Sequence, residues 1–114
     1  MNNILHIATL KDWERAQKNG EYKVESLDKQ GFIHCSKPEQ VIKVANFLFK
    51  GREDLILLSI DPSKVQSEIK YEAPEQAEEK YPHIYGPLNL NAVDTTYSFK
   101  PNYQGYFDLP DSIK

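Results

Sequence analysis

The sequence contains little cysteine, no long apolar run and no excess of basic charge. Its one cysteine, Cys35, excludes a disulfide within the 114-residue chain. No apolar run is long enough to span a bilayer, and the N-terminus lacks the basic start and apolar block of a signal peptide. These features are typical of proteins in a reducing compartment. We therefore expect a cytoplasmic protein without a membrane partner.

The formal net charge is −3 and the isoelectric point is near 5.6. Such a chain has no global positive field to attract DNA or RNA, so we expect no nucleic-acid partner. The length fits one domain. We expect residues 1–114 to form a single domain, with a core at about 3–99 and a tail at 100–114 that packs on the core. The composition leaves the oligomeric state open.

Five segments have the composition or alternation of β-strands. The segment 55–60 is the clearest, because it is apolar on both faces and should lie centrally in a sheet. In 68–73, apolar residues alternate with charged ones, which predicts a half-buried strand with Glu68 and Glu72 on the solvent side. The predicted strands are 4–8, 32–35, 55–60, 68–73 and 91–99.

Capping signals predict two helices. Thr9 and Ser36 are each followed three residues later by an acidic residue, which is a helix-start pattern. The first helix should end at Gly20, and the second should run from about 37 to 50. Capping alone would account for Ser36.

Three segments are predicted to be irregular. Charge and turn-forming residues in 21–30 indicate a loop with room for one helical turn, and the acidic stretch 74–80 indicates a solvated loop. In 81–88, two prolines and a glycine argue against a regular central strand. Helices early and strands late favour an α+β fold, with a bent, mostly antiparallel sheet or sheets and two main helices.

The candidate catalytic residues are the three histidines. His6 and His34 each end a predicted strand just before a residue with a hydroxyl group, so the two junctions could face one cleft. His83 lies in the irregular segment beside aromatic residues. Imidazole can donate, accept or carry charge near neutral pH, and a helix N-terminus favours an anion. For each histidine taken alone, a buried ring that bonds a backbone carbonyl is the competing interpretation.

The residues around these histidines are candidate ligand contacts. Thr9 and Ser36 supply the two hydroxyl groups, and Gln40 lies one turn into the second helix. Tyr85 offers a stacking face, and Gly86 lets another group approach the backbone. Gln40 could equally be a plain exposed residue, and Gly86 could mark a structural kink.

Metal binding and thiol chemistry are weaker interpretations. Zinc accepts three imidazoles, but no two of the histidines have the i, i+4 spacing of a short metal motif. Cys35 follows His34 directly, and neighbouring residues of a strand point to opposite faces, so His34 is a poor base for that thiol. A buried, inert cysteine is the better interpretation, and we assign no metal ligand.

Three motifs resemble the domain-of-unknown-function family nine-five-two. They are a first strand that ends in histidine, the run Gly-Phe-Ile-His-Cys-Ser with a following glutamine, and Pro-His-Ile-Tyr-Gly-Pro-Leu. The resemblance covers about Ile4 to Val93 and leaves out the tail beyond Phe99. It implies a fold similar to that of ADP-ribosyltransferases, which bind NAD in a cleft between two small sheets.

The resemblance also implies roles for individual residues. His6 would lie against the ribose and adenine side of NAD, and His34 and Ser36 near the nicotinamide side. The third motif would contribute His83 or Tyr85 to the site. Many of these transferases carry a glutamate on a late strand. The late motif here has none and offers only His83 and Asn89.

Three functions therefore compete. The first is an enzyme that binds or hydrolyses NAD or transfers its ADP-ribosyl group, with NAD as a substrate and no firm cofactor. The second is a non-catalytic module that binds a nucleotide or another small anion. The third is a hydrolase that holds a metal ion on the three histidines.

Overall fold

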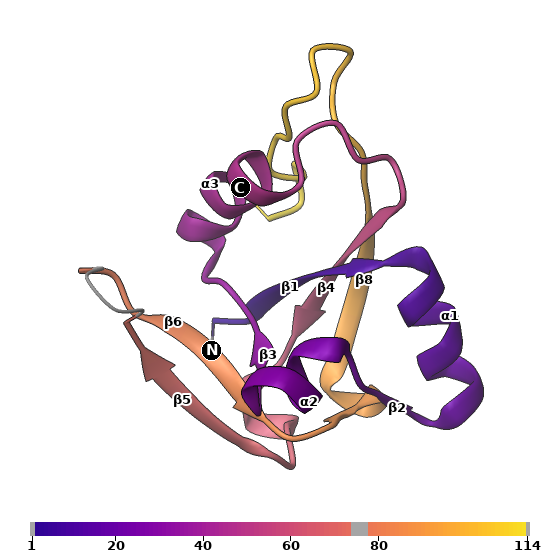
Figure 1. Ribbon diagram of the computed structural model, residues 1–114, viewed down its shortest axis with the longest axis vertical. Coiled ribbons are helices and arrows are strands. Elements are labelled where there is room, and N and C mark those ends of the chain that lie inside the picture. The colour runs from indigo at the N-terminus through magenta and orange to yellow at the C-terminus, as the bar shows by residue number, and fades with distance from the viewer. Residues whose placement is uncertain (1, 74–77, 114) are drawn as a thin grey trace.

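The computed structural model describes residues 2–73 and 78–113 (Figure 1). The part of the predicted acidic loop at 74–77 lies outside the described residues. Within the described part, strands and helices occur in the order expected of an α+β fold, and every strand pair is antiparallel. The described residues form three α-helices, two of them at the positions of the predicted main helices and one in 21–30, where we left room for a helical turn.

The central sheet has three strands in the order β1-β4-β8, which span Ile4–Thr9, Leu55–Ile60 and Val93–Phe99. β4 lies between the other two, as its two apolar faces predicted. The pairing of β4 with β8 has an irregularity between Ser59 and Ile60. β1 therefore forms one edge of this sheet.

A second sheet has the order β3-β6-β5, with strands Ile33–His34, Tyr81–Tyr85 and Glu68–Glu72. β2 (Glu21–Tyr22) and β7 (Leu88–Asn89) form a separate two-stranded pair. These last two strands were not predicted, because two residues are too few to show an alternating pattern.

The prediction that 81–88 contains no regular central strand was wrong. β6 is the middle strand of its sheet although Pro82 lies within it. The backbone N–H of Cys35 still donates to the carbonyl of Pro82 over 3.0 Å. Proline lacks only the donor of that pair, and the pair lies at the end of the short β3 ladder. The sheet therefore loses one bond at its margin and none in its middle.

Helix α1 (Leu10–Asn19) begins and ends as predicted. The hydroxyl of Thr9 accepts a hydrogen bond from the backbone N–H of Asp12 at 3.0 Å, and Gly20 closes the helix with φ 87°. A positive φ suits glycine because it has no Cβ. A short helix, α2 (Glu25–Gln30), follows β2 in the segment that we expected to be mostly a loop.

Helix α3 (Pro38–Leu48) begins differently from the prediction. Its N-cap residue is Lys37, not Ser36, and the side-chain oxygen of Gln40 accepts from the Lys37 backbone N–H at 2.9 Å. Ser36 instead pairs through its backbone with Leu5. The serine hydroxyl is therefore not consumed by capping.

Two buried clusters lie on opposite faces of the central sheet. One is covered by α3 and the C-terminal segment (Figure 1). There Phe107 stacks on Phe99, with ring centroids 4.7 Å apart. The other contains Tyr22, Ile33 and Cys35 and lies between the central sheet and the β3-β6-β5 sheet. Among the described residues, no helix is both long and apolar enough to cross a membrane.

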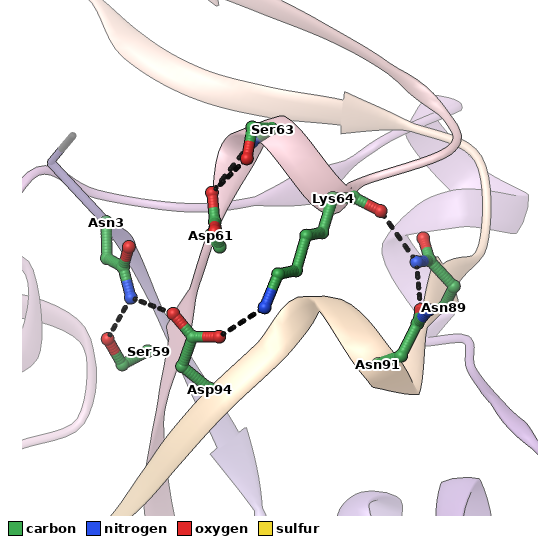
Figure 2. Close-up of polar contacts among 8 residues, drawn as sticks. All are labelled: Asn3, Ser59, Asp61, Ser63, Lys64, Asn89, Asn91 and Asp94. Atoms are coloured by element: carbon green, nitrogen blue, oxygen red, sulfur yellow. Dashed lines mark hydrogen bonds and ion pairs between the residues drawn. The ribbon is translucent and has the colours of Figure 1, made fainter.

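Polar side-chain contacts join the segments around the C-terminal end of β4 (Figure 2). Asn3 donates to Ser59 at 2.9 Å and to Asp94 at 3.0 Å. Asn89 donates to the carbonyl of Lys64 at 2.8 Å. The Asn89 contact holds the loop that leads into β5, so Asn89, which directly follows the third motif, has a structural partner.

Candidate functional site

The two three-stranded sheets meet at a single backbone bridge. Leu5 N–H donates to the carbonyl of Ser36 at 2.8 Å, and Ser36 N–H donates to the carbonyl of Leu5 at 2.7 Å. From this bridge β1 and β3 separate, and no ladder joins them further along in the described residues. We call the region between the two diverging strands, beyond the bridge, the wedge.

The ring of His6 lies in this wedge. Its Nδ1 is 2.5 Å from the carbonyl oxygen of His34, and its Nε2 is 2.7 Å from the hydroxyl of Tyr22. A carbonyl oxygen only accepts, so Nδ1 carries the proton and Nε2 accepts from the Tyr22 hydroxyl. Burial lowers the pKa of His6 to about 4, so the ring is neutral at pH 7.

A cavity of about 500 Å³ opens at the wedge, and we call it the β1–β3 cleft. Its volume is in the range of small-molecule sites. One wall is the apolar side of α3 and the other is formed by β1 and β3. The cleft is lined by Leu5, His6, Ile7, Ser26, His34, Cys35, Ser36, Val44, Phe47, Leu48, Phe49 and Tyr81.

Few polar groups are free to meet a ligand in this cleft. The Ser36 hydroxyl has no hydrogen-bond partner among the described residues, although Ser36 is only 5% exposed. The backbone of Ile7 is also open. The backbone groups of Leu5 point away from β4 and bond Ser36. In an antiparallel strand every second residue points the same way, so the N–H and C=O of Ile7 also point away from β4. On that side the described residues offer them no partner.

His34 stands at the mouth of the cleft with an exposed ring. Its Nε2 lies 2.7 Å from the side-chain oxygen of Gln30, so Nε2 donates and Nδ1 keeps its lone pair. Burial and the neighbouring His83 lower the pKa of His34, in that order. The ring is therefore a neutral acceptor at pH 7.

His83 lies beside His34, because the two residues are direct partners across β3 and β6. Their ring centroids are 5.4 Å apart, and the rings meet edge to face. Nδ1 of His83 is 2.9 Å from Oε1 of Glu72, and the hydroxyl of Tyr85 donates to the same oxygen at 2.5 Å. A carboxylate, two imidazoles and a phenol thus share the outer face of this sheet.

A larger cavity, of about 720 Å³, lies away from these residues. It is bounded by α1, β2 and α2 and is lined mostly by charged side chains such as Asp12, Arg15 and Asp28. It contains none of the predicted site residues. We therefore place the candidate site at the β1–β3 cleft.

Comparison with known proteins gives a family and a fold. The family model described as a protein of unknown function (DUF952) matches residues 7–96. The chain belongs to the DUF952 family. The crystal structure of protein CC0527 from Caulobacter crescentus matches with 27% identity over 97% of each chain and a TM-score of 0.87. Its solution NMR structure covers 98% of this chain and 97% of that one, with 27% identity and a TM-score of 0.84.

A search of curated proteins found no match to the chain. The matched DUF952 region includes His34, Glu72, His83 and Tyr85 and begins one residue after His6. These four residues therefore lie within the matched region, and His6 lies just before it.

The structure brings five of the eight predicted site residues together. His6, His34 and Ser36 line the cleft, and His83 and Tyr85 lie on the sheet face beside His34. Thr9 and Gln40 do not line it. Thr9 caps α1. The side-chain oxygen of Gln40 accepts from the Lys37 N–H, and its Nε2 donates to the carbonyl of Lys80, both at 2.9 Å.

Gly86 is approached closely, but by the protein itself. Its φ is 152°, and a Cβ there would lie 2.5 Å from the hydroxyl oxygen of Ser67. That hydroxyl donates to the carbonyl of Pro87 at 2.8 Å. The kink has a structural cause in this DUF952 domain.

The three-histidine metal site is not formed. Both ring nitrogens of His6 are bonded within the protein, which leaves it no nitrogen for a metal. Among the described residues, no group of three His, Cys, Asp or Glu side chains is arranged to hold a metal ion. The described residues therefore give no support to a hydrolase that holds a metal ion on the three histidines.

Sequence reasoning did not select Glu72, Gln30 or Phe32 as site residues. Glu72 lies on the solvent side of β5, as predicted, with its side chain 40% exposed, and the pairing of β5 with β6 brings it to His83 and Tyr85. The alternation of β5 placed Glu72 on the correct face, but the sequence did not show which strand lay beside it. Phe32 stacks on His83 with centroids 4.0 Å apart.

Proposed function

We propose that the β1–β3 cleft binds NAD and that the protein breaks the bond between nicotinamide and ribose, passing the ADP-ribosyl group to water or another acceptor. The open edge of β1 at Ile7 carries this proposal. It presents a backbone donor and a backbone acceptor inside a largely apolar cavity. The carboxamide of nicotinamide has one donor group and one acceptor, so it can complete the interrupted pairing of the strand.

The lining of the cleft suits the chemistry of such a bond. Nicotinamide leaves as a neutral molecule while positive charge develops on the ribose, so positioning and exclusion of water matter more than a strong nucleophile. Val44, Phe47 and Leu48 form an apolar wall against a flat heterocycle. The hydroxyl of Ser36 and the neutral ring of His34 offer polar contacts beside it.

The architecture adds support by analogy. Two small sheets that separate at one edge resemble the ADP-ribosyltransferase arrangement, in which NAD lies between the sheets. One fold can host many functions, so this likeness supports the proposal without carrying it.

A non-catalytic nucleotide-binding module is the second candidate. The observation that favours it is the complete bonding of His6, which leaves Nδ1 of His34 and the hydroxyl of Ser36 as the unbonded polar groups of the residues predicted for the cleft. In this case the cleft would hold NAD or ADP-ribose without cleaving either.

The test combines binding and turnover. Purified protein is titrated with NAD, ADP-ribose, AMP and nicotinamide while backbone amide signals are followed by NMR, and released nicotinamide is measured by chromatography. NAD should shift the Ile7 amide, and nicotinamide should appear over time. Val44→Trp, which fills the cleft, should abolish both effects. Asp28→Trp, which fills the larger cavity, should abolish neither.

Each outcome separates the candidates. Binding at Ile7 without release of nicotinamide would favour the non-catalytic module. Release that survives in Val44→Trp would place the chemistry outside the cleft. If none of the four compounds binds the intact protein, the NAD proposal is wrong.

A further inference from the structure

The β5–β6 pairing supplies the carboxylate that the third motif lacks. Glu72 lies on β5 directly opposite Tyr81. Its Oε1 accepts hydrogen bonds from His83 and Tyr85 of β6. Because β6 also pairs with β3, the same face carries His34 at the mouth of the cleft. The carboxylate is therefore linked to the cleft through His83 and His34.

The hydrogen bonds around Glu72 fix the proton on His83. The bonds from Tyr85 and from His83 lower the pKa of Glu72, in that order, so the side chain is a carboxylate at pH 7 and only accepts. Nδ1 of His83 must then be a donor. In the neutral ring this leaves Nε2 with its lone pair.

Nε2 of His83 is available for chemistry. It has no hydrogen-bond partner among the described residues, and the residue as a whole is 6% exposed. Phe32 stacked on one face of the ring and His34 against it hold the ring in place.

We propose that His83, oriented by Glu72, is the general base that activates the acceptor of the ADP-ribosyl group, and that the acceptor reacts through a hydroxyl group or as water. This inference rests on the function proposed above. Nε2 of His83 takes the proton from the acceptor O–H while the acceptor oxygen forms a bond to the anomeric carbon of the ribose. The bond from that carbon to the nicotinamide nitrogen breaks, and its electron pair leaves with neutral nicotinamide.

The charges on the sheet face suit this proton transfer. Glu72 is the one anion in contact with His83 among the described residues, and it stabilises the imidazolium that forms. His34, which also faces the ring, is neutral, and the hydroxyl of Tyr85 is held as a donor. Lys70 lies opposite His83 on β5, and its ammonium rests on the Tyr85 ring, 4.8 Å from the centroid. Glu72 is thus a positioning residue, and His83 the catalytic one.

Three variants test the assignment. Glu72→Gln keeps the shape but removes the charge, and His83→Asn keeps a side-chain N–H toward Glu72 but removes the base. Glu68→Gln is the control, because Glu68 lies on the same face of β5 and does not contact His83. All three should bind NAD with a dissociation constant within about twofold of wild type. Nicotinamide release should fall about 100-fold in the first two and stay unchanged in the control.

A spectroscopic measurement checks the pair of His83 and Glu72, which we call the dyad, without turnover. In the neutral form of the His83 ring, nitrogen-15 NMR should show the proton on Nδ1 and none on Nε2, and the opposite tautomer would overturn the proposal. Release by Glu72→Gln at the wild-type rate would overturn the dyad alone. If the wild-type protein releases no nicotinamide at all, the proposed function fails, and the base assignment fails with it.

Discussion

The hydroxyl of Tyr22 donates to Nε2 of His6 over 2.7 Å, and this contact identifies His6 as an acceptor at that nitrogen. Burial raises the pKa of Tyr22, so the hydroxyl keeps its proton throughout the ordinary pH range. With the His34 carbonyl at Nδ1, the ring is held at both ends. His6 thus fixes the width of the wedge between β1 and β3, which defines the shape of the cleft.

Tyr22→Phe should destabilise the protein by about 1–3 kcal/mol, because it leaves a buried Nε2 without a donor. Urea unfolding at pH 7 measures the change. Tyr103→Phe is the matched control, since Tyr103 is 98% exposed and should lose nothing measurable. Equal stabilities for the two variants would contradict the role given to the Tyr22 hydroxyl.

Acidification should weaken the fold through His6. Its pKa is about 4 in the folded protein, against about 6.5 without burial. Between these values the unfolded chain binds the additional proton, so the unfolding free energy falls as the pH drops from 6.5 to 4. The loss should reach roughly 3 kcal/mol, and above pH 6.5 His6 should add no pH dependence.

The pH effect can be isolated with His6→Gln, which cannot titrate. The stability gap between wild type and variant, measured by urea unfolding, should narrow steadily from pH 6.5 to 4.5. Carboxyl groups with lowered pKa values, such as Glu72 and Glu79, occur in both proteins and cancel in this difference. A gap that stays constant over this range would show that His6 is not buried as a neutral ring.

Gly86→Ala should cost about 2 kcal/mol or more, because alanine at φ 152° is strained and its Cβ would meet the Ser67 hydroxyl at 2.5 Å. Gly20→Ala is the comparison, since that site has φ 87° but open space around the new Cβ. Thermal unfolding should rank Gly86→Ala as the more damaging. Adding Ser67→Gly to it should recover part of the loss, and no recovery would mean that the contact is not the cause.

Phe47→Ala should weaken NAD binding about 3- to 10-fold and leave stability unchanged within about 0.5 kcal/mol. Phe47 lines the cleft but is 84% exposed, so its ring is free to cover a ligand. Titration followed by NMR gives the affinity, with Tyr103→Ala as the control, since Tyr103 is also highly exposed but does not line the cleft. Unchanged affinity would remove Phe47 from the binding surface.

Local signals in the sequence predicted local structure well. The apolar run of β4, the Thr9 cap and the Gly20 stop each depend on neighbouring residues, and each is confirmed. The second helix was predicted correctly, but its first turn was not. There the backbone of Ser36 is drawn into a bridge with Leu5, a partner that is distant in sequence.

The site was harder to predict because it depends on strand register. The histidines at the strand ends were visible in the sequence, and two of them line one cleft. The contact of Glu72 with His83 arises from the pairing of β5 with β6. The sequence between the two strands, 73–80, has no short turn motif that would have predicted their register. Pro82 misled the prediction because its missing N–H matters only where a partner strand continues, and β3 has ended there.

The central sheet has a consequence for how the protein is synthesised. β4 pairs on one side with β1 and on the other with β8, and the cluster beside it includes Phe107. A ribosome must therefore release almost all of the described chain before β4 gains its second neighbour. Until then, an apolar strand edge stays open to other nascent chains. The fold should form after translation of this domain rather than during it, and a chaperone that shields β4 in the interval would raise the yield.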